Sequence, residues 1–118
     1  MVNTIFTDNF IFTDENIRNA VDAWCEGPVA AEIKYGHISG WDTSLVTDTK
    51  ELFKDKRYFN DDISQWNVSN VTNMREMFNG ASCFNQPLEQ WNVGNVTNMG
   101  YMFSGSGMTS GNKPPRFR

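Results

Sequence analysis

Large apolar residues recur along this chain at intervals of 25 residues, and mostly polar residues separate them. Tryptophan marks the interval at Trp41, Trp66 and Trp91. When the chain is aligned on these three residues, most of the other large apolar residues come into register. Self-similarity at a fixed period of 20–50 residues is typical of architectures in which each unit buries its apolar face against the next.

A phenylalanine recurs twelve residues after each tryptophan and is preceded each time by leucine or methionine. The phenylalanines are Phe53, Phe78 and Phe103, and the preceding residues are Leu52, Met77 and Met102. Identical residues at the same place in successive units predict columns of Trp, Phe and Met that stack on one another. Columns of Asn and Thr are expected to hydrogen-bond along the stack and to the turn backbone.

Each unit is predicted to contain one strand and one short helix. The spacing Ile63-x-x-Trp66-x-Val68 matches the L-x-x-L-x-L pattern of a leucine-rich-repeat strand. The positions i, i+3 and i+4 of Met74, Met77 and Phe78 favour one face of a helix of about two turns. Capping-box spacing supports the helix starts, because Asp48 precedes Glu51, and Asn73 precedes Glu76, by three residues.

The fold predicted from these patterns is α/β: a short right-handed solenoid of 25-residue, leucine-rich-repeat-like strand-helix units with an N-terminal helical cap. The expected divisions are a cap at 1–40, a solenoid at 41–103 with units 41–65, 66–90 and a partial 91–103, and an irregular Gly/Ser/Pro tail at 104–118.

The two ends depart from the repeat. A helix is expected to start at Thr13, to bury Ile17 and Trp24 on one face, and to end at Gly27-Pro28. A second short helix is expected at 29–35. The C-terminal tail either folds back as a cap or leaves the last unit open to a partner, and the sequence does not separate these alternatives.

Composition narrows the function. The 118 residues fit one domain, and a net charge of −4 with 20% charged residues excludes both a basic nucleic-acid binder and an acidic disordered chain. No apolar run approaches the length of a transmembrane helix, and the first residues lack the pattern of an export signal. The location is left open between an intracellular or particle-associated protein and a surface protein delivered by another route.

Three strings carry a resemblance to a known family: WNVSNVTNMREMF, FNQPLEQWNVGNVTNM and YGHISGWDTSLVTD. They resemble the BspA-like leucine-rich-repeat surface proteins, whose mycoplasma-type repeat domain has no established function. The similarity covers 41–103, and the helix through Trp24 is similar to the segment that opens such arrays. The resemblance implies bacterial surface proteins used in adhesion, with further copies in microbial eukaryotes and large DNA viruses.

Candidate catalytic and metal-binding residues are few. His37 is the only histidine and has Tyr35, Ser39 and Asp42 nearby, but no nucleophile motif accompanies it, so we expect no enzyme activity. Asp61-Asp62 lacks the spacing of a calcium loop, and we expect a solvated turn.

Two further patterns favour structural roles. The sequons at Asn67, Asn70 and Asn95 are better explained by a hydrogen-bonded ladder than by glycosylation. Cys25 and Cys83 follow no metal-ligand spacing, and buried free thiols are favoured over a disulfide. No cofactor and no metal ion is expected.

The predicted function is therefore protein–protein contact without catalysis, as a structural or accessory subunit of a larger assembly. The alternative is an adhesin-like or glycan-binding module. The candidate interaction strip comprises Gln65, Asn67, Gln90 and Asn92, which are small or polar and uncharged. The expected partner is a protein, or a second copy bound through the incomplete C-terminal unit, with no nucleic acid and no membrane insertion. The basic tail residues Lys113, Arg116 and Arg118 are either a solvated terminus or a dock for an acidic partner.

Overall fold

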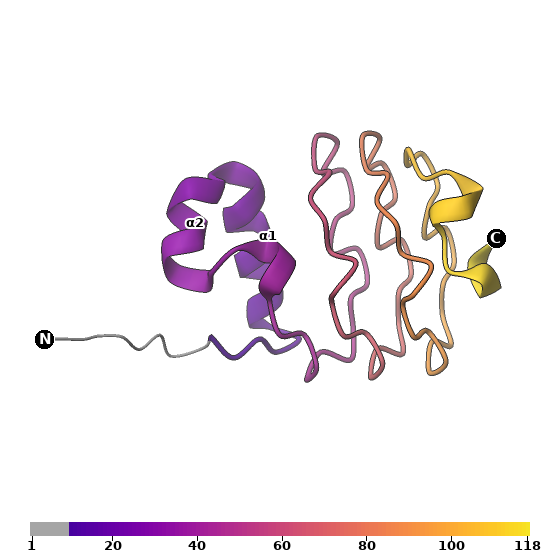
Figure 1. The fold of residues 1–118 in the computed structure, drawn as a ribbon, viewed down its shortest axis with the longest axis horizontal. Helices are drawn as coiled ribbons and strands as arrows, with labels where there is room; N and C mark the ends of the chain where they lie inside the picture. Colours follow the sequence, from indigo (N-terminus) through magenta and orange to yellow (C-terminus); the bar gives the residue numbers. More distant parts are fainter. Residues whose placement is uncertain (1–9) are drawn as a thin grey trace, which may run out of the picture.

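The computed structural model describes residues 10–118. The helices in chain order are α1 (Asn16–Glu26), α2 (Pro28–Tyr35), and the 3-10 helices η1 (Ile38–Gly40), η2 (Ser110–Asn112) and η3 (Pro115–Phe117). Between η1 and η2 the chain forms three loops that lie side by side, as Figure 1 shows. We call these loops layer one (41–65), layer two (66–90) and layer three (91–105).

The prediction of an α/β solenoid of strand-helix units is wrong. Within residues 10–118 the structure contains two α-helices, both before the first layer, and no strand or sheet. The only ladder-like pairings in this range are isolated parallel bridges between Asp48 and Asn73 and between Asn73 and Asn98. The layers are built from turns.

The expected strands are wrong because their backbone closes into consecutive turns. Trp66 N–H donates to the carbonyl of Ile63 (3.1 Å), and Val71 N–H donates to the carbonyl of Val68 (3.0 Å). A bond between residues i and i+3 defines a β-turn, which an extended strand cannot contain. The same spacing of apolar residues therefore buries the side chains through turns.

The expected helices after positions 48 and 73 are wrong because alternate backbone N–H groups donate to the next layer. Phe53 N–H donates to the carbonyl of Met77 (2.8 Å), whereas an α-helix would direct it to residue i−4. Glu51 has a φ of 59°, and its counterpart Glu76 a φ of 54°. A residue in this left-handed region interrupts a right-handed helix.

The predicted capping boxes are replaced by Asx turns. The Asp48 carboxylate accepts from Lys50 N–H (2.8 Å), and the Asn73 side-chain oxygen accepts from Arg75 N–H (3.0 Å). A side chain bonded two residues ahead stabilises a turn instead of starting a helix.

The aromatic columns predicted from the repeat are present in the core. The ring centroids of Phe53 and Phe78 lie 5.4 Å apart and those of Phe78 and Phe103 lie 5.8 Å apart, with nearly parallel planes. Trp41 and Trp66 also stack, at 6.1 Å. Seven of the eight predicted core residues are each at most 5% exposed, and the eighth, Phe103, is half-buried. The eight are Trp41, Trp66, Trp91, Phe53, Phe78, Phe103, Met77 and Met102.

The Asn and Thr columns also hydrogen-bond between layers as expected. Asn70 Nδ2 donates to the carbonyl of Ser44 (2.7 Å), and Asn95 Nδ2 donates to that of Ser69 (2.7 Å). The indole Nε1 of Trp66 donates to the carbonyl of Ile38 (2.8 Å). These bonds satisfy polar groups that the turns leave open.

The predicted N-terminal helix is present as α1 and buries Ile17 and Trp24 as expected, but it begins at Asn16 and not at Thr13. Thr13 and Asn16 bond reciprocally at its start: Thr13 N–H donates to the Asn16 side chain (2.8 Å), and Asn16 N–H donates to Thr13 Oγ1 (3.3 Å). The second predicted helix is confirmed as α2, with Pro28 in its first turn.

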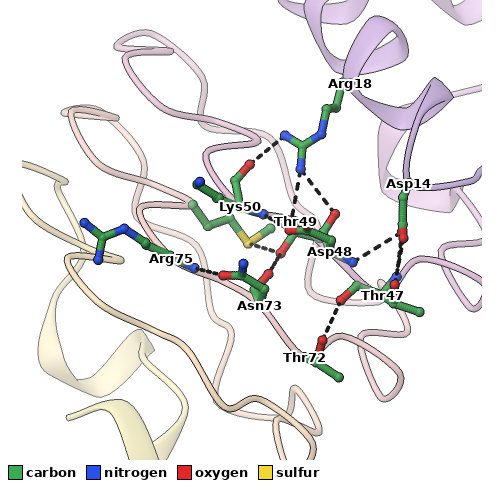
Figure 2. A network of polar contacts seen from close by, with 10 residues as sticks. Asp14, Arg18, Thr47, Asp48, Thr49, Lys50, Thr72, Asn73 and Arg75 are labelled. Atoms are coloured by element: carbon green, nitrogen blue, oxygen red, sulfur yellow. Dashed lines mark hydrogen bonds and ion pairs between the residues drawn. The ribbon is translucent and has the colours of Figure 1, made fainter.

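Two charged side chains from the N-terminal segment hydrogen-bond to backbone groups of layer one. In layers two and three, most of the equivalent groups bond to the preceding layer. The Asp14 carboxylate accepts from Thr47 N–H and Thr47 Oγ1 (both 2.7 Å) and from Asp48 N–H (3.2 Å). The Arg18 guanidinium donates to the carbonyls of Lys50 (2.6 Å) and Asp48 (3.4 Å). Figure 2 shows both side chains reaching across to layer one.

Replacing Phe78 by alanine is expected to destabilise the chain strongly. The ring is fully buried and stacks on both neighbouring layers, so its removal leaves a cavity between three layers. We expect a loss of roughly 3–5 kcal/mol in the free energy of unfolding, measured by denaturant titration. Tyr58→Ala, at a ring that is 82% exposed, is the control. A loss below about 1 kcal/mol for Phe78→Ala would show that the Phe column is not core.

Asp14 is expected to make stability depend on pH at the acidic end. Partial burial raises the pKa of Asp14, but hydrogen bonds from the Thr47 side chain and backbone and from Asp48 N–H outweigh it, so the pKa is lowered overall. Stability gained from a lowered carboxyl pKa is present above the unfolded pKa of about 3.9 and is lost as the pH falls through the folded-state value.

We therefore expect Asp14→Ala to cost roughly 1–2 kcal/mol at pH 7, because the carboxylate is partly exposed, and to cost less below about pH 4. Denaturant titrations of both proteins at a series of pH values measure this difference. Glu15→Ala, at an exposed neighbouring carboxylate, should cost little at any pH. A pH-independent difference for Asp14→Ala would contradict the assigned role of the charge.

Candidate interaction surface

The four residues of the predicted interaction strip are all exposed and lie at matching places on neighbouring layers. Gln65 and Asn67 flank the buried Trp66, and Gln90 and Asn92 flank the buried Trp91. Alternation of exposed and buried residues directs the amide side chains outward while the indoles fill the core. We keep the name interaction strip for these four residues.

The layers hold the strip in a fixed geometry. The Asn67 side-chain oxygen accepts from Ser69 N–H (3.0 Å) and Ser69 Oγ (2.6 Å), and the Asn92 oxygen accepts from Gly94 N–H (3.0 Å). Thr43 Oγ1 donates to the carbonyl of Asn67 (2.9 Å) and joins the strip to layer one. The two asparagine oxygens are thus committed to Asx turns, and the amide nitrogens have no acceptor within 10–118.

The tryptophans do not contribute to the strip's outer surface. Trp41, Trp66 and Trp91 are 3–5% exposed, and Trp24 is 4% exposed. Sugar rings bind proteins largely by stacking on exposed aromatic faces, and the strip offers no such face. The geometry therefore favours hydrogen bonding to a polar partner surface.

The structure gathers His37 and its sequence neighbours around one cavity of about 530 Å³, which Tyr35, Ser39, Trp41 and Asp42 also line. His37 Nδ1 lies 2.8 Å from Ser39 Oγ and accepts from Ser39 N–H (3.2 Å). This contact caps the 3-10 helix η1. The Asp42 carboxylate accepts from Ser44 N–H (3.0 Å) and lies in a separate turn.

That arrangement differs from a nucleophile–base–acid relay. The pKa of Asp42 is lowered by hydrogen bonds from the Ser44 side chain and backbone, so the carboxylate is oriented by Ser44. No carboxylate in 10–118 is hydrogen-bonded to the His37 ring. The cluster's observed contacts stabilise the entry to layer one.

The aspartates at 61 and 62 hold local structure. Asp61 Oδ2 accepts from the Trp24 indole Nε1 (2.8 Å), and Asp62 Oδ1 accepts from Ser64 N–H (2.9 Å). Among the described residues, no group of three or more His, Cys, Asp or Glu side chains could hold a metal ion. In the same range, no helix is long and apolar enough to cross a membrane.

Both cysteines are free and exposed, so the prediction that they are buried is wrong. Although Cys25 is exposed, neighbouring groups partly desolvate its thiol. This desolvation is the largest cause of the shift that raises the pKa of the thiol to about 11. Such a thiol is protonated at neutral pH and is a weak nucleophile.

The sequence did not indicate a second cavity, of about 540 Å³, between the end of α1 and layer one. Its lining includes Trp24, Cys25, Lys56, Tyr58 and Asp61. Lys56 Nζ pairs with Asp22 (2.7 Å) beside it, and this hydrogen bond raises the pKa of Lys56. The residues lie some thirty positions apart in the chain, which is why periodicity alone did not reveal the cavity.

Residues 106–118 of the C-terminal tail fold back on layers two and three, as in the first of the two alternatives, while a row of layer-three N–H groups keeps no acceptor within 10–118. Arg116 donates to the carbonyls of Val93 (2.6 Å) and Val96 (2.8 Å), and Leu88 N–H donates to the carbonyl of Asn112 (2.8 Å). Arg118 donates to carbonyls within the tail (3.0 and 3.1 Å). Two of the three basic tail residues thus have structural partners.

The fold is a stack of turn-built layers closed at its N-terminal end by two helices. A family model described as Mycoplasma protein of unknown function, DUF285, matches residues 7–113, and the chain belongs to this family. The narrower BspA-like leucine-rich-repeat assignment is not confirmed. No curated protein and no solved structure matches the chain.

Acrylamide quenching tests whether the tryptophans are closed to ligands. Because all four indoles are 3–5% exposed, we expect the folded chain to be quenched several-fold less than the chain unfolded in guanidinium chloride. A Stern–Volmer plot showing that one of the four tryptophans is freely accessible would contradict the burial and restore an aromatic platform for glycans.

Proposed function

We propose that this chain is a non-catalytic module that makes protein–protein contacts through the interaction strip, as a structural or accessory subunit of a larger assembly. The observation that carries the proposal is the recurrence of the same exposed amide pair on adjacent layers: Gln65 with Asn67, and Gln90 with Asn92. A partner with polar groups at the layer spacing can engage both pairs at once.

The rigidity of the layers that carry the interaction strip supports this proposal. The layers are joined by backbone hydrogen bonds such as Thr72 N–H to the carbonyl of Thr47 (2.8 Å) and Thr97 N–H to that of Thr72 (2.8 Å). The Phe column stacks behind them. A surface that is ordered before binding loses little conformational entropy on association, which favours affinity.

The chemistry of the strip suggests what kind of contact it makes. Amide groups offer hydrogen bonds without net charge, and the strip carries no aromatic anchor that would dominate the binding energy. Such a surface suits a contact in which several polar hydrogen bonds act together.

An alternative setting for the same contact is a cell surface. It is supported by the resemblance of the repeated strings, such as WNVSNVTNMREMF, to BspA-like surface proteins. In that alternative the partner is a molecule of another cell, and a glycan-binding role belongs to the same class. The buried tryptophans weigh against the glycan form.

Site-specific photocrosslinking tests the proposal. A photoreactive side chain at position 90, added to an extract of the cells that make the protein, should crosslink one defined protein in stoichiometric yield. The matched control carries the same group at position 58, where Tyr58 is exposed outside the strip. Light scattering of the purified chain separates self-association from binding of a different protein.

Equal, diffuse crosslinking from both positions, together with an inert monomer at high concentration, would contradict the proposal. Labelling of intact cells with an impermeant reagent distinguishes the surface setting from an internal assembly.

A further inference from the structure

Layers one and two each use a row of alternate backbone N–H groups to bind the layer that follows. In layer two the donors are Met74, Glu76, Phe78 and Gly80, whose N–H groups pair with carbonyls of layer three at 2.7, 2.9, 2.9 and 2.8 Å. Layer one uses the equivalent row toward layer two. The row is the main backbone connection between layers.

The equivalent row in layer three has no acceptor among residues 10–118. Its members are the N–H groups of Met99, Tyr101, Phe103 and Gly105, and we call them the donor edge. Tyr101 and Gly105 have φ values of 55° and 71°, close to the 54° and 79° of Glu76 and Gly80. Because the backbone conformation repeats, the donor edge presents its N–H groups away from layer two. Tyr101 and Gly105 are exposed.

The surroundings of the donor edge are apolar and positively charged. A cavity of about 300 Å³ lies beside it, lined by Met99, Met102, Phe103, Arg116, Phe117 and Arg118. Lys113 Nζ lies 5.1 Å from the centre of the Phe103 ring. Residues 90–118 contain three cationic and no acidic residues, whereas 1–89 contain all 14 acidic residues of the chain. A negatively charged occupant is favoured here.

The opposite end of the stack shows how this architecture satisfies an open N–H group. There the Asp14 carboxylate accepts from Thr47 N–H (2.7 Å) and Asp48 N–H (3.2 Å). A carboxylate is thus an acceptor that fits backbone donors of a layer, and charge-assisted hydrogen bonds of this kind are the stronger ones.

A second copy of this chain fits the donor edge poorly. Two donor edges placed face to face would oppose N–H groups to N–H groups. The complementary carbonyls on layer one are those of Asp48, Lys50, Leu52 and Lys54. The first two accept from Arg18, and Asp22 of the same helix pairs with Lys56 Nζ (2.7 Å), so α1 lies along this row where a second copy would have to bind. A segment of a different protein is therefore favoured over a second copy of this chain.

We propose that the donor edge binds an extended acidic segment of a partner protein. Oxygens along one side of that segment accept from the N–H groups of Met99, Tyr101, Phe103 and Gly105, and its carboxylates face Lys113 and Arg118. Addition of a peptide to open backbone donors is an established mode of recognition, with the backbone supplying affinity and side chains supplying selectivity. The inference rests on the proposed function, because it gives the binding module a second surface and a partner chemistry.

The test uses the intact chain, labelled with ¹⁵N, and a capped eight-residue peptide of alternating Val and Asp. We expect saturable downfield shifts of the four donor-edge amide protons, and small shifts at the equivalent amides of layer two, which are already bonded. Matched peptides replace every Asp by Asn or by Lys. The Asn peptide should bind at least tenfold more weakly than the Asp peptide, and the Lys peptide should not bind.

Lys113→Glu should weaken binding of the Asp peptide roughly tenfold without altering the rest of the spectrum. Lys50→Glu, the same charge reversal at an exposed residue of layer one, is the control and should leave the affinity near that of the unaltered chain. Equal binding of the Asp and Asn peptides, shifts outside the donor edge, or equal effects of the two variants would overturn the inference.

The outcome is separable from that of the crosslinking experiment. A chain that crosslinks a defined partner from position 90 but shows no donor-edge shifts keeps the proposed function and loses this inference. The converse result places binding at the donor edge and removes it from the interaction strip.

Discussion

The structure depends on one backbone arrangement: alternate N–H groups of layers one and two bond to the layer that follows. Thr49, Glu51, Phe53 and Asp55 donate across to layer two, while Leu52, Lys54 and Lys56 donate within their own turns. In this segment every second peptide group thus joins the layers, and the groups between them form turns within layer one. The aromatic columns fill the space that this pairing encloses, and the exposed amides are placed by the same spacing.

This arrangement gives the stack two chemically different ends. The N-terminal end presents both N–H and carbonyl groups of the backbone. The Asp14 carboxylate accepts from the N–H groups, and the Arg18 guanidinium donates to the carbonyls. The C-terminal end keeps a row of donors, although Arg116 occupies the nearby carbonyls of Val93 and Val96. The distribution of charge follows the same axis, with the acidic residues confined to 1–89. Binding at the C-terminal end and along the strip therefore involves different chemistry.

Within the layers, burial of the large apolar side chains could be predicted from the sequence, but the backbone conformation could not. The spacing of Met74, Met77 and Phe78 correctly indicated three buried side chains, because turns and a helix both bring positions i, i+3 and i+4 to one side. The hydrophobic pattern does not record where a peptide N–H donates, so the inter-layer bonds were missed. Glu51 and Tyr101 have positive φ, and because neither residue is glycine the sequence did not indicate this conformation. Exposure of the interaction strip could be predicted because its residues alternate with buried tryptophans. The folding back of the tail could not, because the bond from Arg116 to the carbonyl of Val93 joins residues more than twenty positions apart.

The most direct test of this account is the measurement of scalar couplings across hydrogen bonds in the chain labelled with ¹⁵N and ¹³C. We expect a coupling between the Phe53 nitrogen and the Met77 carbonyl carbon, and another between the Phe78 nitrogen and the Met102 carbonyl carbon. Couplings from Phe53 to the carbonyl of Thr49, as in an α-helix, would contradict the central claim that alternate N–H groups hold the layers together.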